Sequence, residues 1–170
     1  MKKVSFREDI LPLKNELYRL ALRITMSREE AEDIVQETLI KVWNRRKRWE
    51  EIDSMEAFCL TICRNLALDS IKRKGNQLEY LDETTCQQPT TLASPYEKML
   101  QKDRMELIGT FINTLPEKQK SCMQLRDFEG RSYKEIAQII DISEDQVKVN
   151  IFRARQTLKN KLQNIGKNGL

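Results

Sequence analysis

The sequence predicts an all-α protein, in which two small helical domains are joined by a flexible linker and the C-terminal domain contains a helix-turn-helix. Two observations favour this fold class. Glycine and proline number only 5 and 4 among 170 residues, which is too few for a sheet protein rich in tight turns. Apolar residues recur at helical spacing along most of the chain, and this regular pattern is lost only after residue 75.

The first domain, residues 1–74, contains three predicted helices. Residues 8–25 have one helical apolar pattern. Ser27 and Glu30 then form a capping-box sequence that opens the second helix. One face of this helix is predicted to be buried and consists of Ala31, Ile34, Val35, Thr38 and Val42. A third helix follows in the segment SMEAFCLTICRNLALDSIKRK, and Gly75 is predicted to end it.

Residues 75–103 are predicted to be a linker, because the stretch GNQLEYLDETTCQQPTTLASPYE at its start loses the helical period and gains Thr, Gln, Ser and Pro. Its net charge is −3, whereas the domains before and after it carry +3 and +4. A chain that is basic in its two outer parts and acidic between them is typical of two DNA-contacting modules joined by a linker. In the second domain, residues 104–170, a helical pattern that resumes near Pro95 continues, and residues 116–128 are predicted to form a further helix with proline in its first turn.

The end of the second domain has the pattern of a helix-turn-helix. Ser132 opens a short helix as part of a second capping box, and Ser143 caps the last helix. Between them lies Asp141, where the chain must turn, and aspartate tolerates the left-handed conformation better than most residues. The side of the last helix predicted to pack on the preceding one consists of Val147, Ile151, Ala154, Leu158 and Leu162. In a helix-turn-helix, the second helix enters the major groove of DNA.

The opposite side of the last helix is basic, and no acidic residue follows Asp145. At 100° per residue, Phe152 and Arg153 point away from the core. Surface helices often carry lysine and arginine for solubility alone, but five basic residues directly after a helix-turn-helix bend favour DNA contact. The residues predicted to contact DNA here are Lys148, Val149, Asn150, Phe152, Arg153, Arg155 and Lys159.

Composition argues against an enzyme. The chain has no histidine, which excludes Ser-His and Cys-His catalysis, and it has no glycine-rich phosphate loop. Its four cysteines lack paired CxxC spacing, so we predict no metal site, no catalytic residue and no cofactor. No apolar run approaches the roughly 20 residues that span a bilayer, and charged residues interrupt any signal-peptide core. We therefore expect a cytoplasmic protein that is not inserted into a membrane.

Three motifs, in this order and at these separations, carry a resemblance to a known family. They are AEDIVQET (31–38), FCLTICRNLALDSIKRK (58–74) and LPEKQKSCMQLRDFEGRSYKEIAQIIDISEDQVKVNIFRARQTL (115–158). From about residue 10 to residue 163, the chain resembles the extracytoplasmic-function (ECF) sigma factors of bacteria. The resemblance implies a promoter-specificity subunit that binds core RNA polymerase, recognises the minus-35 and minus-ten promoter elements and initiates transcription.

The resemblance also assigns roles to residues of the first domain. The helix with the AEDIVQE motif would dock on the clamp helices of the polymerase's largest subunit through Glu32, Asp33, Gln36 and Glu37. Asn65 would read a flipped minus-ten base, since an amide both donates and accepts hydrogen bonds. Arg45, Arg46 and Arg48 would neutralise phosphates. Trp49 is a candidate for base stacking, although core packing is the interpretation that we favour for it and for Trp43.

The partners that the resemblance implies are core RNA polymerase (the clamp helices and the flap), promoter DNA and an anti-sigma factor, with the free protein a monomer. A different class of function stays open: a helix-turn-helix transcriptional regulator with a helical effector domain. Such a regulator would not need the acidic helix and the single-strand pocket of the first domain. A third class, an interaction or anti-sigma-like protein without a DNA role, is disfavoured by the basic last helix.

Overall fold

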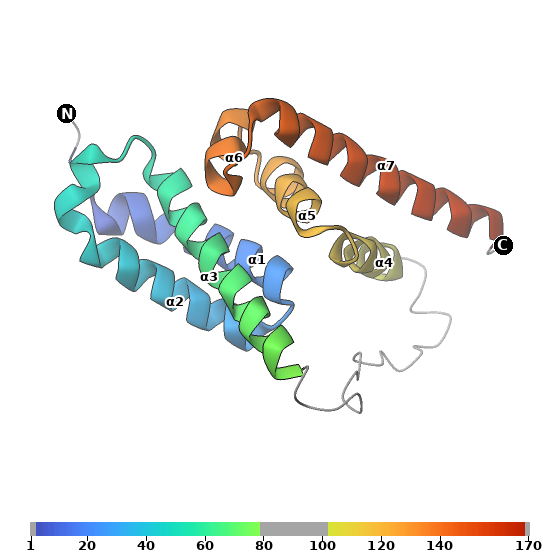
Figure 1. The fold of residues 1–170 in the computed structure, drawn as a ribbon, viewed down its shortest axis with the longest axis horizontal. Helices are drawn as coiled ribbons and strands as arrows, with labels where there is room; N and C mark the ends of the chain where they lie inside the picture. Colours follow the sequence, from blue (N-terminus) through green and yellow to red (C-terminus); the bar gives the residue numbers. More distant parts are fainter. Residues whose placement is uncertain (1–2, 79–101, 169–170) are drawn as a thin grey trace.

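The computed structural model describes residues 3–78 and 102–168, and the regular structure of this part of the chain is entirely helical (Figure 1). The helices are α1 (Lys14–Thr25), α2 (Arg28–Asn44), α3 (Met55–Leu78), α4 (Lys102–Asn113), α5 (Glu117–Met123), α6 (Tyr133–Ile140) and α7 (Glu144–Asn168). Short helical turns cover Phe6–Ile10, Leu11–Leu13, Arg46–Glu51 and Gln124–Phe128. The predicted all-α fold with two helical groups is confirmed. Within the described residues, none of the helices is both long and apolar enough to cross a membrane.

The first group is a bundle of α1, α2 and α3, which we call the N-terminal bundle (Figure 1). Its fully buried side chains include Leu17, Leu20, Ile24, Val42 and Leu60. The face of α2 that the apolar pattern selected is the buried one. Thr38 is tolerated within this face because its hydroxyl donates to the carbonyl oxygen of Ile34, 2.7 Å away.

Two boundaries in the bundle differ from the predictions. Residues 8–25 do not form one helix, because two short turns precede α1. Pro12 lies at this break, and proline cannot donate the backbone hydrogen bond of a continuous helix. The predicted stop at Gly75 is wrong, since α3 continues to Leu78. Glycine lowers helix stability by only about 1 kcal/mol relative to alanine, which a long packed helix tolerates. The rest of the predicted linker up to residue 101, including the pattern near Pro95, lies outside the described residues.

The second group consists of α4 to α7, which we call the C-terminal group. Helix α5 begins at Glu117, directly after Pro116, and the chain stays helical to Phe128 as the sequence predicts. The segment ends at Gly130, whose φ of 72° is in the region that glycine adopts most readily. A small apolar core joins α4, α5 and α7 through Ile112, Leu115, Met123 and Ala154.

The two groups are in contact along a surface that we call the seam, where α1 and α3 meet α5, the turn Gln124–Phe128 and α6 (Figure 1). The main apolar cluster is continuous across it and includes Cys122, Leu125, Ile136 and Ile139 of the C-terminal group. Helix α7 packs on α5 and α6 and runs along the outside of the C-terminal group. The last helix is therefore free on the side that faces away from α5 and α6.

Candidate nucleic-acid interface

The helix-turn-helix is formed by α6 and α7, and its two N-terminal caps are those that the sequence predicts. The Ser132 hydroxyl accepts from the Glu135 amide at 3.1 Å. Ser143 and Gln146 bond reciprocally, at 3.1 Å and 3.0 Å. Asp141 has a φ of 62° and adopts the left-handed conformation at the turn, as predicted. Two capped helix starts and one left-handed residue fix the angle at which α7 leaves the motif.

Helix α7 presents one buried side and one open side. Val147, Ile151 and Ala154 are buried, as the helical pattern predicts. On the open side, Phe152 is 65% exposed, and Arg153 and Val149 are exposed as well. Arg153 and Val149 line a hollow of about 350 Å³ between α7 and the start of α5. An exposed aromatic ring beside an arginine is the combination that can contact a thymine methyl group and a guanine edge in a major groove.

The remaining residues of α7 that were predicted to contact DNA differ in the contacts that their side chains make. Lys159 is exposed, and the Lys148 ammonium lies 5.6 Å from the centre of the Tyr133 ring. Asn150 is half-buried, and its side-chain amide donates to the Gln146 carbonyl oxygen at 2.8 Å. This bond occupies one amide proton and leaves the side-chain oxygen available as an acceptor.

Arg155 is the exception among the predicted phosphate contacts. Its guanidinium makes a two-pronged pair with the Asp127 carboxylate, with an Nε–Oδ2 distance of 3.1 Å. The hydrogen bond to Asp127 raises the pKa of Arg155. This pair fastens α7 to the turn before Gly130, so Arg155 is held at the edge of the helix instead of reaching out as a free cation.

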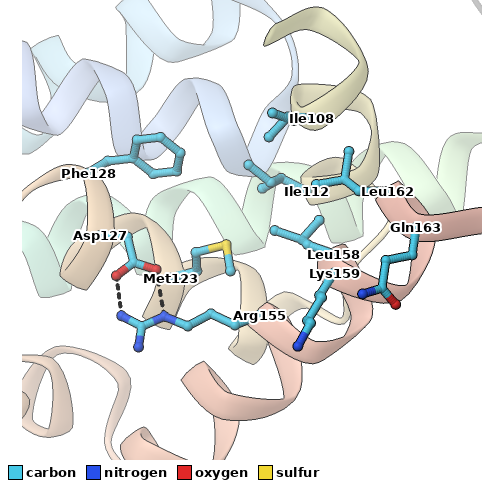
Figure 2. Close-up of a pocket in the computed structure, with 10 residues that line it drawn as sticks. All are labelled: Ile108, Ile112, Met123, Asp127, Phe128, Arg155, Leu158, Lys159, Leu162 and Gln163. Carbon is cyan, nitrogen blue, oxygen red and sulfur yellow. Dashed lines mark hydrogen bonds and ion pairs between the residues drawn. The ribbon is translucent and has the colours of Figure 1, made fainter. Parts of the chain in front are cut away.

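A groove runs along the other edge of α7 and is lined by apolar side chains of α4, α5 and α7 (Figure 2). It has a volume of about 570 Å³. Ile108 and Ile112 line it from α4, and Leu158 and Leu162 line it from α7. Leu162 is exposed there, which differs from the prediction that it packs on α6. The last turns of α7 lie too far along the helix to reach α6, which has only eight residues.

A second basic region lies at the end of α2 in the N-terminal bundle. Arg45, Arg46 and Arg48 are all exposed. The Arg46 guanidinium lies 4.7 Å from the centre of the Trp43 ring and also donates to the Trp43 carbonyl oxygen. Trp43 itself is 45% exposed. An arginine over a partly exposed aromatic ring, with two further exposed arginines in the same segment, can bind both the backbone and the bases of a single strand.

The structure separates the roles of the two tryptophans. Trp49 is only 8% exposed, and its indole N–H donates to the Val42 carbonyl oxygen at 3.0 Å. The ring is therefore part of the core, and of the two it is Trp43 that offers a surface for base stacking. Sequence reasoning did not favour Trp43, because helical spacing alone cannot tell which of two nearby rings the following turn will cover.

Asn65 is exposed on α3, as a base-reading role requires. It lies two helical turns after Phe58, whose ring centre is 5.9 Å from the Arg45 guanidinium. The preceding residue, Arg64, is buried instead and pairs with Glu117 of α5 at 2.5 Å. Sequence reasoning missed this pair, because 53 residues separate its members.

The four predicted polymerase-contacting residues, Glu32, Asp33, Gln36 and Glu37, are all exposed and lie on the side of α2 opposite its buried face. Glu37 has a cationic neighbour one turn on, Lys41, at 4.0 Å. At the start of α2, Ser27 accepts from the Glu30 amide, but the reciprocal bond of a capping box is replaced by others. The Ser27 amide donates to the Thr25 hydroxyl, and the Glu30 carboxylate pairs with Lys74 of α3 at 2.5 Å.

Two family models match this chain. Residues 10–77 match sigma-70 region 2, and residues 105–158 match sigma-70 region 4. The first match contains the acidic stripe of α2, its basic end and Asn65. The second contains the helix-turn-helix and most of the basic side of α7. The two matched segments thus contain all of the predicted polymerase-contacting and DNA-contacting residues except Lys159.

Curated relatives and solved structures agree with these matches. The chain is 30% identical over 148 residues to the ECF RNA polymerase sigma factor SigE of Mycolicibacterium smegmatis, covering 86% of this chain and 57% of that protein. It is 28% identical over 148 residues to the ECF RNA polymerase sigma-E factor of Haemophilus influenzae, covering 81% of this chain and 77% of that protein. The chain therefore spans little more than half the length of the first of these relatives.

The fold is similar to that of the sigma factor RpoE of Bartonella quintana, solved in complex with the anti-sigma factor NepR. The TM-score is 0.75 at 24% identity, over 93% of this chain and 96% of that one. It is also similar to CnrH in complex with the cytosolic domain of CnrY, with a TM-score of 0.67 at 18% identity, over 94% and 88% of the two chains.

Proposed function

The chain belongs to the ECF class of sigma-70 RNA polymerase sigma factors, and we propose that it works as the promoter-recognising subunit of core RNA polymerase. One observation supports this most directly: a capped helix-turn-helix presents Phe152 and Arg153 on a helix with no acidic residue after Asp145. In this proposal, residues 1–74 bind the polymerase and the minus-ten element, residues 75–103 are a linker, and residues 104–170 bind the minus-35 element.

The exposed acidic stripe of α2 binds the clamp helices of the polymerase's largest subunit. Asp33 and Glu37 lie one helical turn apart on the exposed side, and the buried face of α2 holds this stripe rigid. A carboxylate row on a fixed helix can complement a basic partner and steer its approach. The expected effect of the double change Asp33→Lys and Glu37→Lys is a loss of polymerase capture without a loss of helicity.

The minus-ten site consists of Asn65 and the basic end of α2. Asn65 reads the Watson–Crick edge of one unstacked base, and the guanidinium groups of Arg45, Arg46 and Arg48 neutralise the backbone. We place the stacking contact on Trp43, because the ring of Trp49 is enclosed by the core. The pocket needs a melted strand, so the free protein should bind duplex promoter DNA poorly.

The minus-35 site is the open side of α7. Arg153 and Phe152 contact base edges, with Val149 and Asn150 beside them, and Lys148 and Lys159 contact phosphates. Arg155 has an indirect role, because its ion pair with Asp127 holds α7 in its orientation. Arg153→Ala should cost about 1–3 kcal/mol and relax preference at one upstream position. Lys159→Ala should weaken binding about equally on all sequences and flatten its salt dependence by about one phosphate.

An anti-sigma factor is the expected regulatory partner, since the similar structure of RpoE is that of a sigma factor in complex with an anti-sigma factor. The polymerase flap is the expected second contact of the holoenzyme. The chain acts as a monomer in the cytoplasm, where polymerase and promoter DNA are found, and it has no catalytic role of its own, because polymerase supplies the chemistry.

Run-off transcription with purified core polymerase tests the proposal. Transcripts should start at one site only when this protein is added, and Asn65→Ala should reduce melting at that site more than it reduces initial binding. Permanganate reactivity of unpaired thymines measures melting directly. Tight, sequence-specific binding of duplex DNA by the protein alone, with no effect on polymerase, would instead support the regulator with a helical effector domain.

A further inference from the structure

The seam contains most of the buried polar side chains of the protein. Among the described residues, six buried side chains are polar or charged: Glu16, Thr38, Arg64, Lys120, Ser121 and Gln124. All except Thr38 lie where the N-terminal bundle meets the C-terminal group. Buried charges are rare in permanent cores, whereas interfaces between domains of one chain are more polar than those of obligate partners. The charged part of such a surface remains compatible with water when it separates, and it lies beside apolar residues of the main cluster, such as Leu125 and Ile136.

Arg131 is the central residue of the seam. Its guanidinium reaches across from the loop before α6 and forms a two-pronged pair with Glu16 of α1, at 2.8 Å and 2.5 Å. The same guanidinium also contacts Glu56 of α3 and, at 3.1 Å, Glu135 of α6. The hydrogen bonds to Glu16, first, and to Glu56 raise the pKa of Arg131, which is therefore charged at every accessible pH.

Two further pairs cross the seam. Arg64 of α3 holds Glu117 of α5 in a two-pronged pair, and Glu117 also accepts from the Ser121 hydroxyl at 2.5 Å. Arg19 of α1 binds Glu129 through two hydrogen bonds of 2.5 Å and 2.7 Å. The pairs of Arg131 with Glu16 and Glu56, of Arg64 with Glu117 and of Arg19 with Glu129 each join an arginine of one group to a carboxylate of the other, so the seam is fixed by charge at several points.

The closed arrangement brings the two proposed reading sites close together. Arg64, next to Asn65, bonds to Glu117, and the residue after Glu117 is Lys118, which lines the hollow beside Arg153. Asn65 and Arg153 are therefore connected through a short series of neighbouring residues. The minus-ten and minus-35 elements, in contrast, lie about 25 base pairs apart, which is about 85 Å of duplex at 3.4 Å per base pair. The closed chain cannot engage both elements of one promoter.

We propose that the seam is an autoinhibitory latch: Arg131 and its carboxylates hold the chain closed, and the chain acts in transcription only after the seam opens. This inference rests on the proposed function. In the closed state the acidic stripe of α2 stays exposed, so the N-terminal bundle can make a first, weak contact with polymerase, whereas full binding through both groups requires the open chain. Opening then frees the C-terminal group to reach the upstream element. The fraction of open chains scales the apparent affinity for polymerase and promoter together.

The latch should respond to salt, because charge pairs that border solvent are screened when the Debye length falls from about 10 Å at 0.1 M to about 3 Å at 1 M. Glu56 is half-exposed and Arg19 is too, so part of the seam is open to ions. We therefore expect the purified full chain to be compact in 50 mM salt and more extended in 500 mM salt.

Small-angle X-ray scattering of the full chain measures opening without polymerase or DNA. Arg131→Glu places a fourth carboxylate among three and should enlarge the radius of gyration at low salt. Adding Glu16→Arg to this variant rebuilds one crossing pair with the charges exchanged and should restore part of the compaction. Arg131→Lys keeps the charge but loses the two-pronged geometry, and it should lie between the wild type and Arg131→Glu.

Arg7→Glu is the matched control, because Arg7 is exposed in the first turn of the chain and the change alters net charge by the same amount. This variant should scatter like the wild type. Far-ultraviolet circular dichroism must show unchanged helicity for every variant, so that opening is distinguished from unfolding. If Arg131→Glu loses helicity, the comparison of the wild type with Arg131→Lys at both salt concentrations decides whether weakening the Arg131 pairs opens the seam.

The second measurement titrates each variant against core polymerase at low salt. Arg131→Glu should reach half-saturation at a several-fold lower concentration than the wild type and than Arg7→Glu. Unchanged scattering for the arginine variants and at both salt concentrations would overturn the latch. Clear opening without any gain in polymerase binding would overturn its autoinhibitory role. Failure of the wild type to bind polymerase would count against the proposed function, whereas the scattering result would stand on its own.

Discussion

The interior of the N-terminal bundle and the seam are held together in different ways. In the bundle, Leu17, Leu20 and Leu60 are fully buried among other apolar side chains. At the seam, Arg64, Arg131 and Glu16 are enclosed and paired across the boundary. An apolar core is strongly favoured in water and is hard to take apart, whereas a charged interface has a solvated alternative. The comparison indicates which parts of this chain stay together and which can separate.

The largest expected effect comes from the bundle interior. Leu60→Ala should lower the free energy of unfolding by about 2–5 kcal/mol, because it removes buried methyl groups and leaves a cavity. Both tryptophans are in this half of the chain, so urea unfolding followed by tryptophan fluorescence reports on the bundle. Ile40→Ala, on the exposed side of α2, should change stability by no more than about 0.5 kcal/mol. Equal losses of unfolding free energy in Leu60→Ala and Ile40→Ala would contradict the larger contribution expected of the bundle interior.

A smaller effect is expected at the seam. Arg64→Met leaves Glu117 without its principal partner and should weaken the attachment of the C-terminal group by about 1–3 kcal/mol. Circular dichroism follows all helices, whereas tryptophan fluorescence follows the bundle alone. We therefore expect the two urea transitions to separate in this variant, with the fluorescence transition close to that of the wild type. Coincident transitions that shift together would indicate that the seam belongs to one permanent core.

Lys120 should give a stabilising change. Burial, followed by the charge of Arg23, lowers its pKa, so the protonated side chain is unfavourable in the closed state. Lys120→Met should therefore stabilise the closed chain, by about 1 kcal/mol at neutral pH. As pH rises through the lowered pKa towards 10.5, the wild-type lysine loses its proton, its penalty disappears and the difference between the two proteins should narrow. Thermal unfolding at pH 7 and pH 10 measures the difference in stability between the two proteins. A Lys120→Met variant that is less stable than the wild type at pH 7 would contradict this prediction.

The smallest expected effect distinguishes two buried thiols. Burial raises the pKa of Cys63 in the bundle to about 12 and that of Cys122 in α5 to about 11. Both should react slowly with iodoacetamide at pH 8, because fewer than roughly one thiol in a thousand is ionised. High salt should accelerate Cys122 a few-fold by opening the seam and leave Cys63 unchanged. Mass spectrometry of labelled peptides gives both labelling rates. Faster labelling of Cys63 than of Cys122 would contradict the expectation that the seam opens more readily than the bundle.

The features that were predictable from the sequence depend on neighbouring residues. Capping by Ser132 and Ser143 uses partners three residues away, and the left-handed turn at Asp141 is a property of the residue itself. The buried face of α2 follows from a period of 3.6 residues. Such short-range features make the helix-turn-helix and its open side recognisable from the amino-acid sequence alone.

The features that were not predictable depend on distant residues or on context. The bond between Arg131 and Glu16 joins positions 115 residues apart, and no sequence period links them. The continuation of α3 through Gly75 overrode a local preference, and Trp43 is 45% exposed although core packing was favoured for it. Arg155 was predicted as a phosphate contact at the edge of α7, and the sequence did not indicate its pair with Asp127, which lies 28 residues earlier.

The charged seam also bears on how the chain is made. The apolar residues that close the N-terminal bundle lie between residues 10 and 67, so the bundle can fold once this portion has left the ribosome. At about 5–20 residues per second, Arg131 follows residue 67 by roughly 3–13 seconds. During this interval Glu16, Arg64 and Glu56 meet water instead of a protein surface, which suits charged groups better than apolar ones. A nascent chain of this design presents a partly charged surface to chaperones and to neighbouring chains while it waits for its second half.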